Sequence, residues 1–267
     1  VIVAPSRTAI GRAGKGSFVD ARPDDMTAFI IDDVLGKVPE LPRDQIEDVI
    51  WGTAQPGGEQ GYNLGRVAGL LAGFSLNILA ADIAPLQQRW AEIQYQLPED
   101  QKADAFEALA AEAGQALAQE LDDAPLLIWR GIILSSWAGA DGGLGALGKV
   151  KEAKSLFEHA LQVDPQALQG SAYTSLGALY YQVPGWPIGF GDDEQAEALL
   201  KQALALNPDG IDSNYFWGDY LIDQKRYAEA RTALLKAQGA APRPDRPLAD
   251  EGRQAEIRAR LDKIANR

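Results

Sequence analysis

The chain has 267 residues, 46% of them hydrophobic and 24% charged, which is typical of a globular protein. Its net charge of −13 at pH 7 would repel nucleic acids and anionic membranes, so we expect neither as a partner. The absence of cysteine excludes disulfides and thiolate chemistry, and no stretch approaches the roughly 20 apolar residues of a membrane span.

Residues 1–74 predict alternating strands and helices. Residues 1–4 and 46–52 are short and rich in β-branched side chains, which predicts two strands. Pro23 opens a predicted amphipathic helix that runs to Leu35, with acidic residues near its N-terminus, and residues 63–72 predict a second helix. This alternation predicts a small α/β unit with a parallel sheet.

Four motifs of this segment resemble the start of a thiolase (acetyl-CoA acetyltransferase). They are Val1-Ile2-Val3, Arg7-Thr8-x-Ile10-Gly11-Arg12, Asp48-Val49-Ile50-Trp51-Gly52 and Gly58-Glu59-Gln60-Gly61-Tyr62-Asn63-Leu64-x-Arg66-Val67-Ala68. The resemblance covers about residues 1–74 and stops after Phe74. It departs at Ala9, where the family usually has Pro, and at Gly65, where it usually has Ala. It implies, as an alternative function, an acyl-CoA-related role for the segment.

The catalytic groups that this resemblance implies are missing. Thiolases use a nucleophilic Cys shortly beyond the matched stretch, a His in a Gly-His-Pro motif and a second Cys in a Cys-x-Gly motif. This chain has no Cys, and its single histidine, His159, is followed by Ala160. Because the Claisen chemistry needs the thiolate, we expect no thiolase activity and interpret the segment as a truncated or fused remnant. On the fusion interpretation, only residues beyond about Ala81 have a biological role.

Residues 75–123 predict a junction followed by a leading pair of helices. Small residues before Asp82 resemble the end of a signal peptide, although the position is internal. Each predicted helix has one apolar face. These faces are Leu86, Trp90, Ile93 and Leu97, then Phe106, Leu109, Ala113 and Leu117.

Residues 124–244 contain a repeated pattern. Four positions recur 34 residues apart, namely Ala196 and Ala230, Leu200 and Leu234, Ala203 and Ala237, and Pro208 and Pro242. Gly131, Ala153, Phe157, Ala160 and Pro165 form a third copy upstream. This period is typical of tetratricopeptide repeats, in which each unit is two antiparallel helices. We therefore predict a mainly α protein, in which a helical-hairpin solenoid of three repeats follows the α/β fragment. Residues 245–267 are predicted to form a capping helix, whose many charges suit an exposed position.

Two repeats carry extra residues between their helices. We predict loops at 138–145 and 184–192 on one edge of the solenoid, where insertions often mark a binding edge. With Pro-Gly-Trp-Pro at 184–187 followed by Gly-Asp, residues 81–267 resemble bacterial periplasmic tetratricopeptide proteins, such as the T component of tripartite ATP-independent periplasmic transporters. The resemblance implies binding of a partner or apolar ligand. It also implies a periplasmic location if the repeats belong to a mature secreted protein; the sequence as written indicates the cytoplasm.

We predict two candidate binding surfaces. In the first, Trp186 and Phe190 line an apolar pocket with Tyr180, Tyr181 and Trp137; alternatively, the first two rings only tuck under their loop. The second is the concave face of the solenoid, where extended peptides commonly bind. Its predicted residues are Tyr173, Asn214, Tyr215 and Asp219.

We predict no catalytic residue, metal or cofactor. Residues 143–148 match the glycine pattern of dinucleotide sites, but no strand precedes them. Asp192 and the acidic residues after it indicate the start of a helix over 194–206 rather than a metal site. The predicted function is a non-enzymatic scaffold that binds a protein, a peptide or a small apolar ligand. The identity of the ligand and the oligomeric state stay open.

Overall fold

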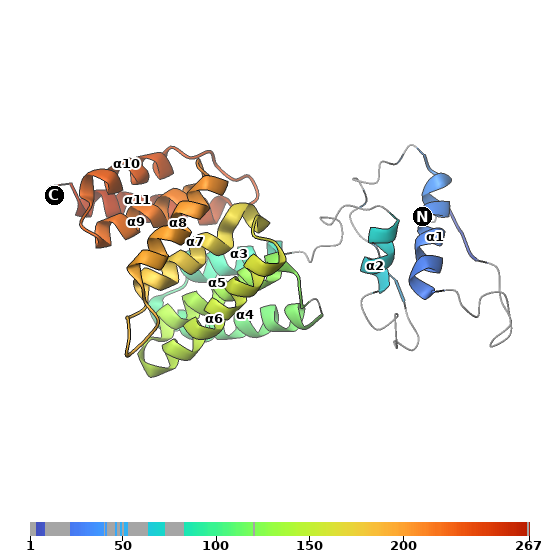
Figure 1. Cartoon of the computed structure of the whole chain (residues 1–267), viewed down its shortest axis with the longest axis horizontal. Coiled ribbons are helices and arrows are strands. Elements are labelled where there is room, and N and C mark those ends of the chain that lie inside the picture. Colours follow the sequence, from blue (N-terminus) through green and yellow to red (C-terminus); the bar gives the residue numbers. More distant parts are fainter. Residues whose placement is uncertain are drawn as a thin grey trace. The chain divides into compact units, whose positions relative to one another are not determined.

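The computed structural model describes residues 4–8, 22–39, 41, 46, 49, 51–52, 64–72, 83–119, 121–265 and 267. The chain divides into two compact units, residues 1–80 and residues 81–267 (Figure 1). The prediction of a mainly α protein is confirmed, because the described residues are largely helical and form no strand. In the described part of the chain, every helix is too short or too polar to cross a lipid bilayer.

The first unit contains two described helices, α1 (Pro23–Gly36) and α2 (Leu64–Leu71). They pack through small side chains, because Ala28, Ala68 and Ala72 form their buried cluster. Both helices agree with the prediction from sequence. Of the predicted strands at 1–4 and 46–52, residues 4, 46, 49, 51 and 52 are described and none of them is in a strand, and the other residues lie outside the described part of the chain.

The second unit is built from helices that pack against their neighbours in the chain (Figure 1). The helices are α3 (Ala84–Gln96), α4 (Glu99–Gln119), α5 (Ala124–Asp141), α6 (Gly143–Val163), α7 (Ala167–Gln182), α8 (Asp193–Leu206), α9 (Ile211–Asp223), α10 (Tyr227–Gln238) and α11 (Pro247–Lys263). The tightest pairs are α5 with α6, α7 with α8 and α9 with α10. The predicted inner faces of α3 and α4 are largely buried, with Phe106 and Leu109 fully enclosed.

The residues that recur 34 positions apart occupy equivalent places. Leu200 and Leu234 are both fully buried, and each lies against a glycine of the preceding helix. A Cβ atom on Gly177 would lie 2.8 Å from Leu200 Cγ, and one on Gly218 would lie 2.7 Å from Leu234 Cγ. Any larger residue at these glycines would therefore separate the paired helices.

The predicted loop at 138–145 is not formed, and this prediction was wrong. Its residues instead lengthen α5 and α6, which are joined by Gly142 alone. Gly142 has a φ of 64°, a left-handed conformation that glycine adopts without a steric cost, and its N–H donates to the carbonyl oxygen of Ala138. The sharp turn at one glycine removes the need for a longer connection.

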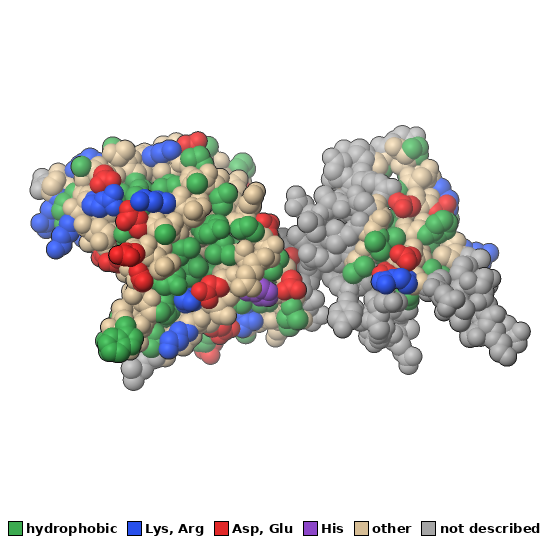
Figure 2. Space-filling view, in the orientation of Figure 1, with side chains coloured by type: hydrophobic (Ala, Val, Ile, Leu, Met, Phe, Trp, Pro, Cys, Tyr) green, Lys and Arg blue, Asp and Glu red, His purple; other side chains and the backbone are tan. Residues whose placement is uncertain are grey.

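The second insertion does form a loop, between α7 and α8. Its ends are held together by hydrogen bonds from Gly191 N to Pro184 O (3.0 Å) and from Asp192 N to Tyr180 O (2.9 Å). Asp192 caps α8 as predicted, since its carboxylate accepts from the backbone N–H groups of Glu194 and Gln195. Hydrophobic side chains project at the tip of this loop (Figure 2), where Trp186 is 90% exposed and Ile188 is 68% exposed.

Helix α11 does more than the predicted exposed cap, because it packs on α3, α9 and α10. A Cβ atom on Gly252 would lie 2.4 Å from the Tyr95 ring, so the first and last helices of this unit touch closely. Several of the charged side chains that suggested an exposed helix instead face acidic residues of α9. Arg253 pairs with Asp212, and Arg260 pairs with Asp219.

Candidate ligand-binding site

A cavity of about 410 Å³, here called the inner cavity, lies within the second unit. Side chains of α3, α4, α5, α7, α9 and α11 line it, together with Phe157 of α6 and Arg246 just before α11. The cavity lies where α11 packs on α3 and α9, with α5 and α7 on its other sides.

One wall of the inner cavity is aromatic. Trp90 makes edge-to-face contacts with Tyr95 and Trp129, at centroid distances of 5.8 and 5.9 Å. The indole N–H of Trp90 donates to Ser136 Oγ at 2.8 Å, which fixes this ring. Burial raises the pKa of Tyr95 well above its usual value, so its phenol lines the cavity as an uncharged group. Rigid rings of this kind suit the apolar body of a small ligand.

Hydroxyl groups line another part of the cavity. Ser135 and Ser136 come from α5, and Ser171, Thr174 and Ser175 come from α7. The α5 hydroxyls donate within their own helix, Ser135 to Gly131 O at 2.8 Å and Ser136 to Ile132 O at 3.0 Å. The cavity therefore combines aromatic surface with a small number of uncharged polar groups.

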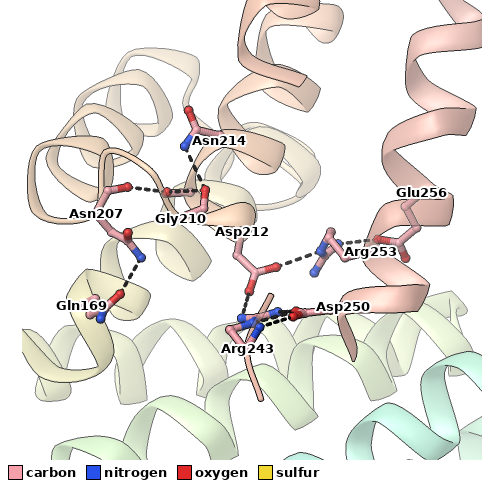
Figure 3. A network of polar contacts seen from close by, with 10 residues as sticks. Gln169, Asn207, Gly210, Asp212, Asn214, Arg243, Asp250, Arg253 and Glu256 are labelled. Carbon is pink, nitrogen blue, oxygen red and sulfur yellow. Dashed lines mark hydrogen bonds and ion pairs between the residues drawn. The ribbon is translucent and has the colours of Figure 1, made fainter. Parts of the chain in front are cut away.

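A network of charged side chains forms the end of the cavity near α9 and α11 (Figure 3). Asp212 accepts from Arg243 Nη1 and Arg253 Nε, each at 2.8 Å. Arg243 Nε also donates to Asp250 at 2.7 Å, and Arg253 also pairs with Glu256. Burial raises the pKa of Asp212, but the positive charges of Arg253 and Arg243 outweigh it and hold that pKa well below its usual value.

Helix α11 covers part of the predicted concave surface. The Arg253 guanidinium lies 4.3 Å from the centre of the buried Tyr215 ring. Asp219 pairs with Arg260 at 2.5 Å and accepts from the Tyr181 hydroxyl at 2.9 Å. The side chain of Asn214 is buried and donates to the carbonyl oxygens of Pro208 and Gly210, so it holds the start of α9 (Figure 3).

The predicted apolar pocket around the second insertion is not assembled as expected. Phe190 packs edge-to-face on Tyr180 at 5.6 Å, whereas Trp186 is almost fully exposed and does not tuck under its loop. Trp137 is half-buried beneath Lys149, whose Nζ lies 4.3 Å from the ring centre. Tyr173 is half-buried on α7.

None of the nine predicted site residues lines the inner cavity in the described chain. Tyr181 and Asp219 instead line a second, more polar hollow of about 590 Å³ beside the end of α11. Trp90 and Arg246 were not predicted as site residues because both lie outside the recognised repeats, and Trp129 was not because its place in α5 within the first repeat gave no sign that it lines a cavity. The available signal was the pair of aromatic residues in α3, Trp90 and Tyr95, and the several arginines in and before α11.

Comparison with known proteins concerns the other end of the chain. The thiolase N-terminal domain family matches residues 1–86. The N-terminal segment is thiolase-like. The 3-ketoacyl-CoA thiolases of Vibrio vulnificus (strain YJ016), Aeromonas salmonicida (strain A449) and Aliivibrio salmonicida (strain LFI1238) are 39%, 39% and 40% identical to this chain over 83 residues.

The thiolase-like match covers only part of this chain and only part of each relative. It covers 31% of this chain and 21% of each relative, so the chain spans about a fifth of the length of the curated relatives it matches. The resemblance predicted from the motifs is confirmed, and the family match runs past Phe74 to residue 86. The inner cavity, lined by residues 90–256, lies beyond the matched residues.

Proposed function

We propose that residues 81–267 form a non-enzymatic scaffold of the tetratricopeptide type that binds a small organic ligand in the inner cavity. Two features support the repeat assignment. The leucines and alanines spaced 34 apart are buried alike, and Gly177 and Gly218 make the same close contact with Leu200 and Leu234. Consecutive helices pair as helical hairpins do.

The inner cavity is the observation that favours a small ligand. Its volume of about 410 Å³ and its mixture of aromatic and hydroxyl side chains are typical of small-molecule sites. An extended peptide on the concave face has less support, because α11 already contacts Tyr215 and Asp219 there.

Gly139 offers a direct test, since it lies on α5 at the edge of the cavity and a Cβ there would meet no heavy atom within 4 Å. A Gly139→Trp side chain should therefore enter the cavity without disturbing the helix. We expect the wild-type chain to bind one molecule of the neutral apolar probe N-phenyl-1-naphthylamine, and the variant to bind it about tenfold more weakly or worse. Fluorescence titration of the probe measures both affinities.

Gly148→Trp is the matched control, because Gly148 lies on α6 away from the cavity and is equally free of neighbours within 4 Å. It should bind the probe as the wild type does. Absence of saturable binding to the wild type, or equal binding to wild type and Gly139→Trp, would contradict a ligand site in the inner cavity.

An acyl-CoA-related role of the thiolase-like segment is the second candidate, and the match over residues 1–86 is its support. We expect no cleavage of acetoacetyl-CoA by the purified chain, because its 267 residues contain no cysteine to form the acyl-thioester. A spectrophotometric thiolysis assay tests this expectation. Retention of coenzyme A in native mass spectrometry, without turnover, would favour a binding role for the segment.

A further inference from the structure

Two buried nitrogen donors of the inner cavity have no hydrogen-bond partner among the described residues. They are Nε1 of Trp129 and Nε of Arg246. Trp129 is only 3% exposed, and both residues line the cavity. Buried donors are almost always paired in folded proteins, so two unpaired donors in one cavity indicate a missing acceptor.

The neighbouring Trp90 lies in the same wall of the cavity, and its indole N–H has a hydrogen-bond partner. Its N–H donates to Ser136 Oγ at 2.8 Å, although its ring lies only 5.9 Å from that of Trp129. The protein thus supplies an acceptor for one of two adjacent buried indoles and leaves the other N–H, which is shielded from solvent, without one.

Arg246 differs in the same way from the two arginines near it. Arg243 and Arg253 form ion pairs with Asp212, whereas no ion pair of Arg246 occurs in the described chain. Its guanidinium carbon lies 4.9 Å from the centre of the Trp129 ring, so both unpaired donors belong to one contact. Burial lowers the pKa of Arg246 and the charge of Arg243 lowers it further, and together they outweigh the opposite effect of Asp212 and Asp250.

We propose that the inner cavity binds a small organic anion, whose carboxylate accepts hydrogen bonds from Trp129 Nε1 and Arg246 Nε while its apolar body lies against the aromatic wall. The inference rests on the function proposed above and names the chemical class of the ligand. A carboxylate fits because it offers two oxygen acceptors to two donors.

The acidic residues of the cavity favour a single negative charge on the ligand. Asp212 and Glu256 are already paired with Arg253, and Glu99 is paired with Lys102 at 2.6 Å. Among the described cationic residues that line the cavity, Arg246 is the one left to balance an incoming charge, so a monoanion matches the site better than a dianion.

Octanoate and octanamide test the proposal, because they share a chain and differ in the charge of the head group. Competition with N-phenyl-1-naphthylamine on the full chain should give octanoate about a tenfold higher affinity than octanamide. Trp129→Phe should weaken octanoate binding about tenfold, and Arg246→Gln should abolish the preference for the acid. Trp217→Phe and Arg258→Gln, which change the same residue types outside the cavity, should leave both affinities unchanged.

A nuclear magnetic resonance measurement keeps the test decisive if a variant misfolds. In the wild-type chain, octanoate should shift the indole N–H resonance of Trp129 downfield, as a new hydrogen bond requires, and octanamide should shift it less. Equal affinity for acid and amide, or a Trp129 resonance unmoved by octanoate, would overturn the anion site while leaving a neutral-ligand cavity intact. If the neutral naphthylamine probe does not bind to the wild-type chain, the proposed function itself would be overturned.

Discussion

Replacing Leu234 with alanine is expected to lower the free energy of unfolding of the second unit by about 2–5 kcal/mol. Leu234 is fully buried, and its Cγ fills the space opposite Gly218, so the truncation leaves a cavity between α9 and α10. Urea denaturation followed by circular dichroism at 222 nm measures the loss. The size of the effect tests the packing on which the repeat assignment depends.

The next residue of α10 is a matched control. Leu235 is 52% exposed, so the same substitution there, Leu235→Ala, should change the free energy of unfolding by less than about 0.5 kcal/mol. Both variants make the same change in helix propensity, and the difference between them therefore reports burial alone. Equal losses at the two positions would show that α10 does not present this face to α9.

Removing the charge of Asp212 is expected to have the second large effect. Asp212→Asn should lower the free energy of unfolding by about 3 kcal/mol at pH 7, because the carboxylate forms ion pairs with both Arg243 and Arg253, each at 2.8 Å. The Asp212 side chain is half-buried, and Arg253 keeps Glu256 and Arg243 keeps Asp250, so the loss should not exceed the lower end of the range for a broken buried ion pair.

The same carboxylate predicts a pH dependence. Burial opposes ionisation of Asp212, but Arg253 and Arg243 hold its folded-state pKa well below the ordinary value of about 3.9. A lowered pKa means that the charge stabilises the fold at pH values above about 4 and that this stabilisation is lost as the pH falls further. The difference between wild type and Asp212→Asn should therefore be full at pH 7 and smaller at pH 2.

Urea titrations of both proteins at several pH values measure this dependence. Asp262→Asn is the control, because Asp262 is an exposed residue of α11 and its substitution should cost less than about 0.5 kcal/mol at any pH. A constant difference between wild type and Asp212→Asn from pH 7 to pH 2 would contradict the role given to the charge.

The helices of the second unit were largely predictable because their signals are local. Leu86, Trp90 and Ile93 recur at helical spacing and are buried together, and the 34-residue period predicted which leucines and alanines of α8 and α10 face inward. Asp192 was recognisable as an N-cap from its place before an acidic first turn. Each of these features depends on residues within a few turns of one another.

The inner cavity was not predictable in this way, because its contacts join distant parts of the chain. Trp90 donates to Ser136, 46 residues away, and Arg253 bonds to Asp212, 41 residues away. No periodicity encodes such pairs. The charged residues of α11 predicted a solvent-exposed face, but in the folded protein α9 lies beside them.

The amino-acid sequence alone was enough to identify the thiolase-like start, the absence of a cysteine nucleophile, the mainly helical character and the inward faces of most helices. Residue type and local spacing specify all of these. The closure of α11 on α3, the helical continuation through 138–145 and the unpaired donors of Trp129 and Arg246 emerged with the folded structure. They depend on which surfaces meet in three dimensions, and long-range packing, not local pattern, selects those surfaces.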